Sequence, residues 1–85
     1  MRIAIGSDHG GFKLKEEIIE HLRAKNIEFK DFGAYNEDSS DYADFALQVA
    51  EAVAAAEYDF GILVCGTGIG ISIAANKVPG VRAAL

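Results

Sequence analysis

The sequence lacks most features that would place it outside small globular proteins. It has one cysteine in 85 residues, so it cannot form an internal disulfide, which fits a reducing compartment and predicts a cytoplasmic protein. It has no apolar run near the roughly 20 residues of a membrane span. It opens on Arg2-Ile3-Ala4-Ile5 without a signal-peptide pattern. Basic side chains number eight against thirteen acidic ones and form no stripe. We therefore expect neither a membrane nor a nucleic-acid partner.

Several cofactor motifs are also missing. Without a Cys-x-x-Cys pair or a Cys/His spacing typical of zinc sites, the sequence favours neither dithiol redox chemistry nor a structural metal. The glycine-rich stretch Gly66-Thr67-Gly68-Ile69-Gly70 is not the dinucleotide fingerprint, because its third glycine comes one residue early. No Gly-Lys-Ser/Thr motif follows it. A nucleotide site is therefore disfavoured.

The composition indicates one folded domain over residues 1–85. Apolar residues make up 51% and charged residues 25%, which excludes a disordered chain. The charge is uneven, because all thirteen acidic residues lie in residues 1–59 and only Lys77 and Arg82 carry charge after them. Residues 60–85 also hold five of the nine glycines. An acidic, solvated part is thus followed by an apolar, glycine-rich and weakly basic part.

Apolar runs and periodicities predict alternating strands and helices. The apolar stripe of the first helix is Leu14, Ile18, Ile19 and Leu22, with Lys15 among the polar residues. The predicted order is a strand at 3–5, a helix at 11–24, a strand at 27–32, a helix at 42–56, a strand at 60–65, a helix at 71–76 and a strand at 81–85. This β-α-β-α-β-α-β order predicts an α/β fold, a three-layer α/β/α Rossmann-like arrangement with four parallel strands. A last strand without a covering helix leaves a bare sheet edge, so we expect the chain to be part of a longer domain.

Two glycine-rich loops are the candidate site. Residues 7–11 and 65–70 each follow a predicted strand and enter a helix, and they open on one crevice if the first and third strands are neighbours. A helix start presents free N–H groups that suit a phosphate or an oxyanion, and glycine lets a ligand approach the backbone. The alternative is that the glycines only permit tight connections.

Each candidate site residue also has two interpretations. Cys65 precedes a helix N-terminus, which favours the thiolate form as base or nucleophile, but it could also be a small buried hydrophobe. Asp8 and His9 either serve a ligand, or Asp8 caps the next helix and His9 is solvated. Tyr42 is either a core residue or a crevice hydroxyl. Thr67 could contact substrate or bond the turn backbone.

Three stretches together resemble the type B ribose-5-phosphate isomerases, within the sugar-phosphate isomerase family that includes galactose-6-phosphate isomerase. They are Ser7 to Gly11, Asp41-Tyr42-Ala43-Asp44, and the long block from Gly61 to Lys77. The resemblance spans all 85 residues, and the Cys-Gly-Thr-Gly block is its most specific part. The family commonly has alanine where Gly10 stands and proline where Ala43 stands, and neither departure removes a reactive group.

The resemblance implies an aldose–ketose isomerase that uses an enediolate and no metal or organic cofactor. Cys65 matches the family's proton-transferring base, and Thr67 is assigned to catalysis with it. The implied substrate-binding positions are Asp8, His9, Tyr42, Gly66, Thr67, Gly68, Ile69 and Gly70. The implied partner is a small sugar phosphate: ribose 5-phosphate, or alternatively an allose or galactose 6-phosphate. A non-catalytic sugar-phosphate-binding module is the other alternative.

The resemblance further implies a homodimer or homotetramer for the full-length form, with each site built from two chains. The family's ring-opening histidine and phosphate-binding arginines come after the position of Leu85. We therefore expect the 85-residue chain to be inactive by itself.

Overall fold

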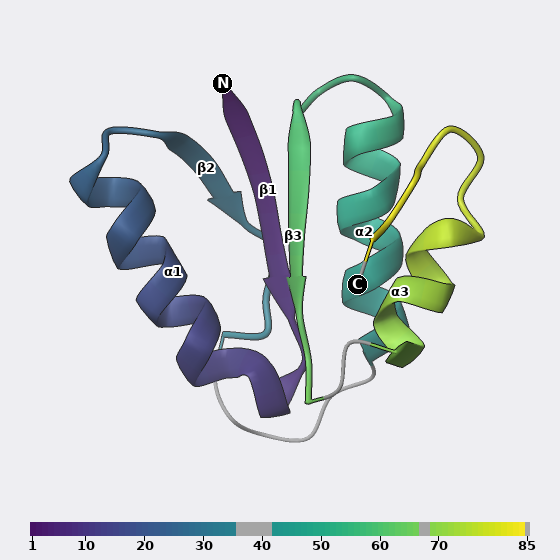
Figure 1. The fold of residues 1–85 in the computed structure, drawn as a ribbon, viewed down its shortest axis with the longest axis horizontal. Coiled ribbons are helices and arrows are strands. Elements are labelled where there is room, and N and C mark those ends of the chain that lie inside the picture. Colours follow the sequence, from purple (N-terminus) through teal and green to yellow (C-terminus); the bar gives the residue numbers. More distant parts are fainter. Residues whose placement is uncertain (36–41, 67–68, 85) are drawn as a thin grey trace.

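Strands and helices alternate along the chain (Figure 1). A computed structural model describes residues 1–35, 42–66 and 69–84. The elements in these ranges are β1 (Arg2–Ser7), a short 3-10 helix η1 (His9–Gly11), α1 (Phe12–Ala24), β2 (Glu28–Asp31), α2 (Tyr42–Ala54), β3 (Phe60–Val64) and α3 (Ile69–Asn76). They lie close to the predicted positions. Within the described ranges, no helix is both long and apolar enough to cross a membrane.

The strands of the described residues form one parallel sheet in the order β2-β1-β3. Ile5 is paired with Asp31 of β2 on one side and with Ile62 of β3 on the other. Figure 1 shows this sheet between α1 on one side and the pair α2 and α3 on the other. The predicted α/β class, the parallel sheet and its three layers are therefore confirmed.

The core lies where α2 packs on β1 and β3. Ala4 of β1 and Val49 of α2 are almost completely buried. A Cβ atom on Gly61 would lie 2.8 Å from Val49 Cγ1, and one on Gly6 would lie 3.0 Å from Val49 Cγ2. Both distances are shorter than an ordinary carbon–carbon contact. Glycine at these two strand positions therefore allows the helix to approach the sheet closely.

The predicted fourth strand is wrong for residues 81–84, which form no strand. The side chain of Asn76 occupies the backbone groups that a strand would use. Its Nδ2 donates to the carbonyl of Ala83 at 3.1 Å, and its Oδ1 accepts from the N–H of Ala83 at 2.9 Å. Val81 N–H bonds back to the Val78 carbonyl at 3.2 Å. The segment thus turns back on α3, and Leu85 lies outside the described residues.

The buried face of α1 is also displaced from the predicted one. Leu14 is 51% exposed, whereas Lys15 is completely buried. The buried positions of this helix are Lys15, Ile19 and Leu22, which follow the spacing i, i+4, i+7 of one helical face. The expectation that Leu14 belongs to the core and Lys15 to the solvated face is therefore wrong.

Candidate active site

The candidate site lies at the carboxyl ends of β1 and β3. The two strands are direct neighbours, with Ser7 in register with Val64, and the N–H of Asp8 donates to the Val64 carbonyl at 3.2 Å. From β1 the chain passes to β2 on one side, and α2 then leads back to β3 on the other. The strand order therefore reverses between β1 and β3, where open α/β sheets bind ligands. The two predicted loops do open on one edge.

The loop after β1 is closed by a side-chain cap. Asp8 has an extended backbone (φ −83°, ψ −176°), and its Oδ1 accepts a hydrogen bond from the N–H of Gly11 at 2.8 Å. This confirms the capping role considered for Asp8, which is compatible with a ligand contact through its other oxygen. His9 is exposed on η1. The cap holds the loop so that the acidic and imidazole groups stay at the strand end.

Gly11 allows η1 and α1 to touch the end of β3. A Cβ atom at this position would lie 2.5 Å from the Val64 carbonyl oxygen and 2.7 Å from the Val64 carbonyl carbon. Its φ of −96° is open to any residue. The glycine is therefore needed for the close approach of the two loops, and no unusual backbone angle is involved.

The second loop begins at Cys65, which directly follows β3 and is half-buried. Gly66 is exposed, and a Cβ atom there would meet nothing within 4 Å. The backbone at Gly66 therefore faces open space. Thr67 and Gly68 lie outside the described residues, so the roles predicted for them remain predictions.

The remaining predicted site residues lie on helices. Ile69 begins α3 with a side chain that is 56% exposed, and Gly70 follows it. Tyr42 begins α2, but its side chain lies outside what the structure describes. The structure thus brings the Asp8 loop and the Cys65 turn to one edge.

Sequence reasoning missed three residues beside this edge. Ser7 was expected in the polar turn, yet it ends β1, is completely buried, and its hydroxyl has no hydrogen-bond partner among the described residues. Lys15 and Asp31 form an ion pair at 2.8 Å. The burial of Lys15 could have been predicted from its spacing, because Ile19 and Leu22 follow it at i+4 and i+7.

A hollow of about 260 Å³ lies away from this edge, along β3. Its lining comes mainly from β3, α2 and residues 80–83, and includes Val49, Phe60, Leu63 and Arg82. It contains neither Asp8 nor Cys65. Its lining is mostly apolar, with Asp59 and Arg82 as its charged residues, and it lies apart from the two strand-end loops.

The fold and the edge together define an α/β protein in which the Asp8 loop and Cys65 follow the neighbouring strands β1 and β3 at the switch point. Comparison with known families identifies it further. The Ribose/Galactose Isomerase family model matches residues 3–85. The chain belongs to this family.

Individual relatives agree with this assignment. The chain is 55% identical over 82 residues to ribose-5-phosphate isomerase B of Escherichia coli K12, a match covering 96% of the chain and 55% of that protein. The structure of Clostridium thermocellum ribose-5-phosphate isomerase B superposes with a TM-score of 0.95 at 60% identity, covering 96% of the chain and 55% of that structure. The Mycoplasma genitalium enzyme with bound ribulose-5-phosphate superposes with a TM-score of 0.90 at 48% identity, covering 98% and 56%. The chain therefore spans about half the length of the relatives it matches.

Proposed function

We propose that this chain carries the proton-transfer half of an aldose–ketose isomerase site that interconverts ribose 5-phosphate and ribulose 5-phosphate. The observation that carries the proposal is the meeting of the Asp8 loop and the Cys65 turn at one sheet edge in a chain of this family. A relative of the chain binds ribulose-5-phosphate.

Cys65 is the proton-transfer base of the proposed reaction. Its thiolate removes the proton from the carbon next to the carbonyl of the open-chain sugar, which gives an enediolate. The same group then returns the proton to the neighbouring carbon while the hydroxyl proton passes from one enediol oxygen to the other, so the carbonyl moves by one position and no cofactor is consumed. A positioned acid–base group of this kind contributes about 10²–10⁴-fold to the rate.

The turn after Cys65 stabilises the negative oxygen of the enediolate. The open space beside Gly66 leaves room for a substrate oxygen against the backbone N–H groups of positions 66–70, and Thr67 supplies a hydroxyl in the same turn. Loss of one such donor costs about 10²–10³-fold in rate. Asp8 and His9, across the switch point, contact the sugar hydroxyls, and Tyr42 closes the crevice from the start of α2.

The test compares the 85-residue chain with a chimera in which it is fused to the remaining part of the Escherichia coli relative. We expect the chimera to convert ribose 5-phosphate, and Cys65→Ala to lower its turnover by about 10²–10⁴-fold. The exposed Lys25→Met is the control and keeps the activity. A folded chimera whose turnover survives Cys65→Ala contradicts the assignment of the base.

The second candidate function is a sugar-phosphate-binding module without turnover. It is favoured by the open space beside Gly66, where a Cβ atom would meet nothing within 4 Å, because an anion can approach the backbone there without any proton transfer. Calorimetry of the 85-residue chain with ribulose 5-phosphate, allose 6-phosphate and galactose 6-phosphate separates the candidates, because the family includes galactose isomerases. Binding by the chain together with an inactive chimera supports the module.

A further inference from the structure

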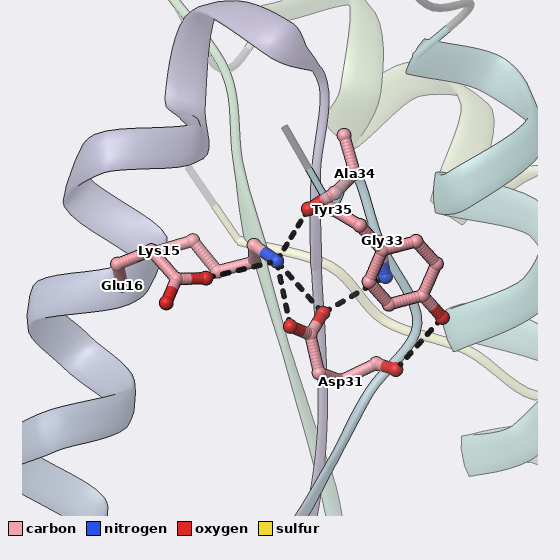
Figure 2. A network of polar contacts seen from close by, with 6 residues as sticks. All are labelled: Lys15, Glu16, Asp31, Gly33, Ala34 and Tyr35. Carbon is pink, nitrogen blue, oxygen red and sulfur yellow. Dashed lines mark hydrogen bonds and ion pairs between the residues drawn. The ribbon is translucent and has the colours of Figure 1, made fainter. Parts of the chain in front are cut away.

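We infer that Lys15 is a positioning residue of the candidate site, which holds the segment Asp31–Tyr35 against the carboxyl end of β1. The inference deepens the proposed isomerase function and rests on it. Figure 2 shows the ammonium group of Lys15 at the centre of the network that ties α1 to this segment.

The ammonium group of Lys15 is committed to the protein. Its Nζ donates to Oδ1 and Oδ2 of Asp31, each at 2.8 Å, and to the Ala34 carbonyl at 2.6 Å. The Glu16 carboxylate lies 3.6 Å away, and the Lys15 side chain is completely buried. Since an ammonium has three protons to donate, these acceptors use its capacity. Lys15 therefore acts on a ligand only through the residues that it holds.

The segment that Lys15 holds is also bonded to the end of β1. Asp31 Oδ1 accepts from the N–H of Gly33 at 2.9 Å. The Gly33 carbonyl in turn accepts from the N–H of Ser7 at 2.6 Å, and the Ala34 N–H donates to the Ser7 carbonyl at 2.7 Å. The segment is thus fixed between α1 on one side and the last residue of β1 on the other.

This arrangement couples Lys15 to the β1 side of the candidate site. Ser7 directly precedes Asp8, so a displaced Asp31–Tyr35 segment displaces the strand end that carries the Asp8 loop. A shift of about 1 Å in positioning groups is enough to cost about 10²-fold in activity.

The ion pair makes this placement depend on Lys15 in particular. The Asp31 side chain is 24% exposed, so removal of Lys15 leaves a mostly buried carboxylate without its cation, which is strongly unfavourable. It also removes the donor to the Ala34 carbonyl. The rings of Phe12 and Tyr35 lie 5.3 Å and 5.7 Å from the ammonium and would then face an uncompensated negative charge.

The experiment separates positioning from stability with two variants of the 85-residue chain. Lys15→Met removes the cation, and Lys15→Met/Asp31→Asn also removes the unpaired charge while keeping an acceptor for the Gly33 N–H. Lys25→Met, an exposed lysine beyond the end of α1, is the matched control. The measurements are the urea unfolding midpoint, the ribulose 5-phosphate affinity by calorimetry, and the hydrogen exchange of the Ser7 and Ala34 amides.

We expect the double variant to recover the unfolding midpoint that the single variant loses. Its affinity for ribulose 5-phosphate should nevertheless stay about 10–100-fold lower, and both amides should exchange faster than in the control. A double variant that recovers stability, affinity and slow exchange together overturns the inference. So does one that fails to fold, because Lys15 would then serve folding itself.

Where the 85-residue chain binds no ribulose 5-phosphate, the affinity of the same variants is measured in the chimera, and a folded chimera that binds none contradicts the proposed function instead. The exchange rates of the Ser7 and Ala34 amides still test the placement of the segment in that case. Slow exchange at both amides of the double variant overturns the inference.

Discussion

Replacement of Gly11 by alanine should break the contact between the loop after β1 and the end of β3. The added Cβ would lie 2.5 Å from the Val64 carbonyl oxygen. The end of β3 and the start of α1 must therefore separate by about 0.9 Å to reach an ordinary contact of about 3.4 Å. Because the atoms that must move belong to the Val64 backbone, no side-chain rotation relieves the clash. The Asp8 N–H to Val64 carbonyl bond of 3.2 Å lies within the region that opens.

The expected cost of Gly11→Ala is about 1–3 kcal/mol in the free energy of unfolding, as for other overpacked sites. In a domain of this size each kcal/mol lowers the unfolding temperature by about 4–8 °C. Urea and thermal unfolding followed by circular dichroism measure both quantities. The separation of the loops should also weaken sugar-phosphate binding, measured by calorimetry at a temperature where the variant is folded.

Gly10→Ala is the matched control, because the same atom is added one residue earlier. There the Cβ would meet only Asp8 Oδ1, at 3.4 Å, which is an ordinary contact. We expect stability within about 0.5 kcal/mol of the parent, or a gain of up to about 1 kcal/mol from the stiffer unfolded chain. Equal losses at the two positions, or no loss at Gly11, would refute the close approach as the reason for glycine.

Two further pairs of substitutions test the cap and the packing of the sheet. Asp8→Ala removes the acceptor of the Gly11 N–H and should lower the free energy of unfolding by about 0.5–2 kcal/mol, whereas Asp8→Asn keeps the cap and most of the stability. Equal urea midpoints for both variants would contradict the cap. Gly61→Ala places a Cβ 2.8 Å from Val49 Cγ1 and should cost about 1–3 kcal/mol, and the second change Val49→Ala should recover part of that loss. If Val49→Ala only adds a further loss of stability in urea unfolding, the clash with Val49 is not the reason for the cost of Gly61→Ala.

The strands that consist of apolar runs could be predicted from the sequence. The runs Ile3–Ile5 and 60–65 both became strands of a parallel sheet. β1 is buried as expected, whereas β3 at the edge of the described sheet leaves Phe60 60% exposed, so the expectation that this run is buried on both faces is wrong. The position of the site followed from the same order, because neighbouring β1 and β3 bring their loops to one edge. Local sequence patterns therefore predicted most of the strands and helices.

Helix ends were less predictable, as α2 shows. The alanine-rich pattern continues to Ala56, yet the helix ends at Ala54. Ala56 has a φ of 60°, and the Glu57 N–H bonds back to the Ala52 carbonyl at 3.2 Å, a closure more often made with glycine. Alanine is the best helix former, so local propensity gave no sign of this turn.

The least predictable feature was the buried charge at Lys15. A lysine is almost never completely buried unless it is paired, and its partner Asp31 lies sixteen positions away on another element. Nothing in the sequence around Lys15 or Asp31 indicates that the other residue is its partner. Only the fold, which places α1 beside the end of β2, shows why this charge does not face solvent.

Three basic residues, Lys15, Lys77 and Arg82, do not bring a free charge to this edge. Lys15 is neutralised by Asp31, so its charge is not available to a phosphate. Lys77 follows the end of α3, and the eight residues of that helix span about 12 Å, which carries the side chain away from the Cys65 turn. Arg82 lines the hollow along β3, which does not include the Cys65 turn. Under the proposed function, the phosphate group of the substrate therefore finds no cation from Lys15, Lys77 or Arg82 at the edge that holds Asp8, His9 and Cys65.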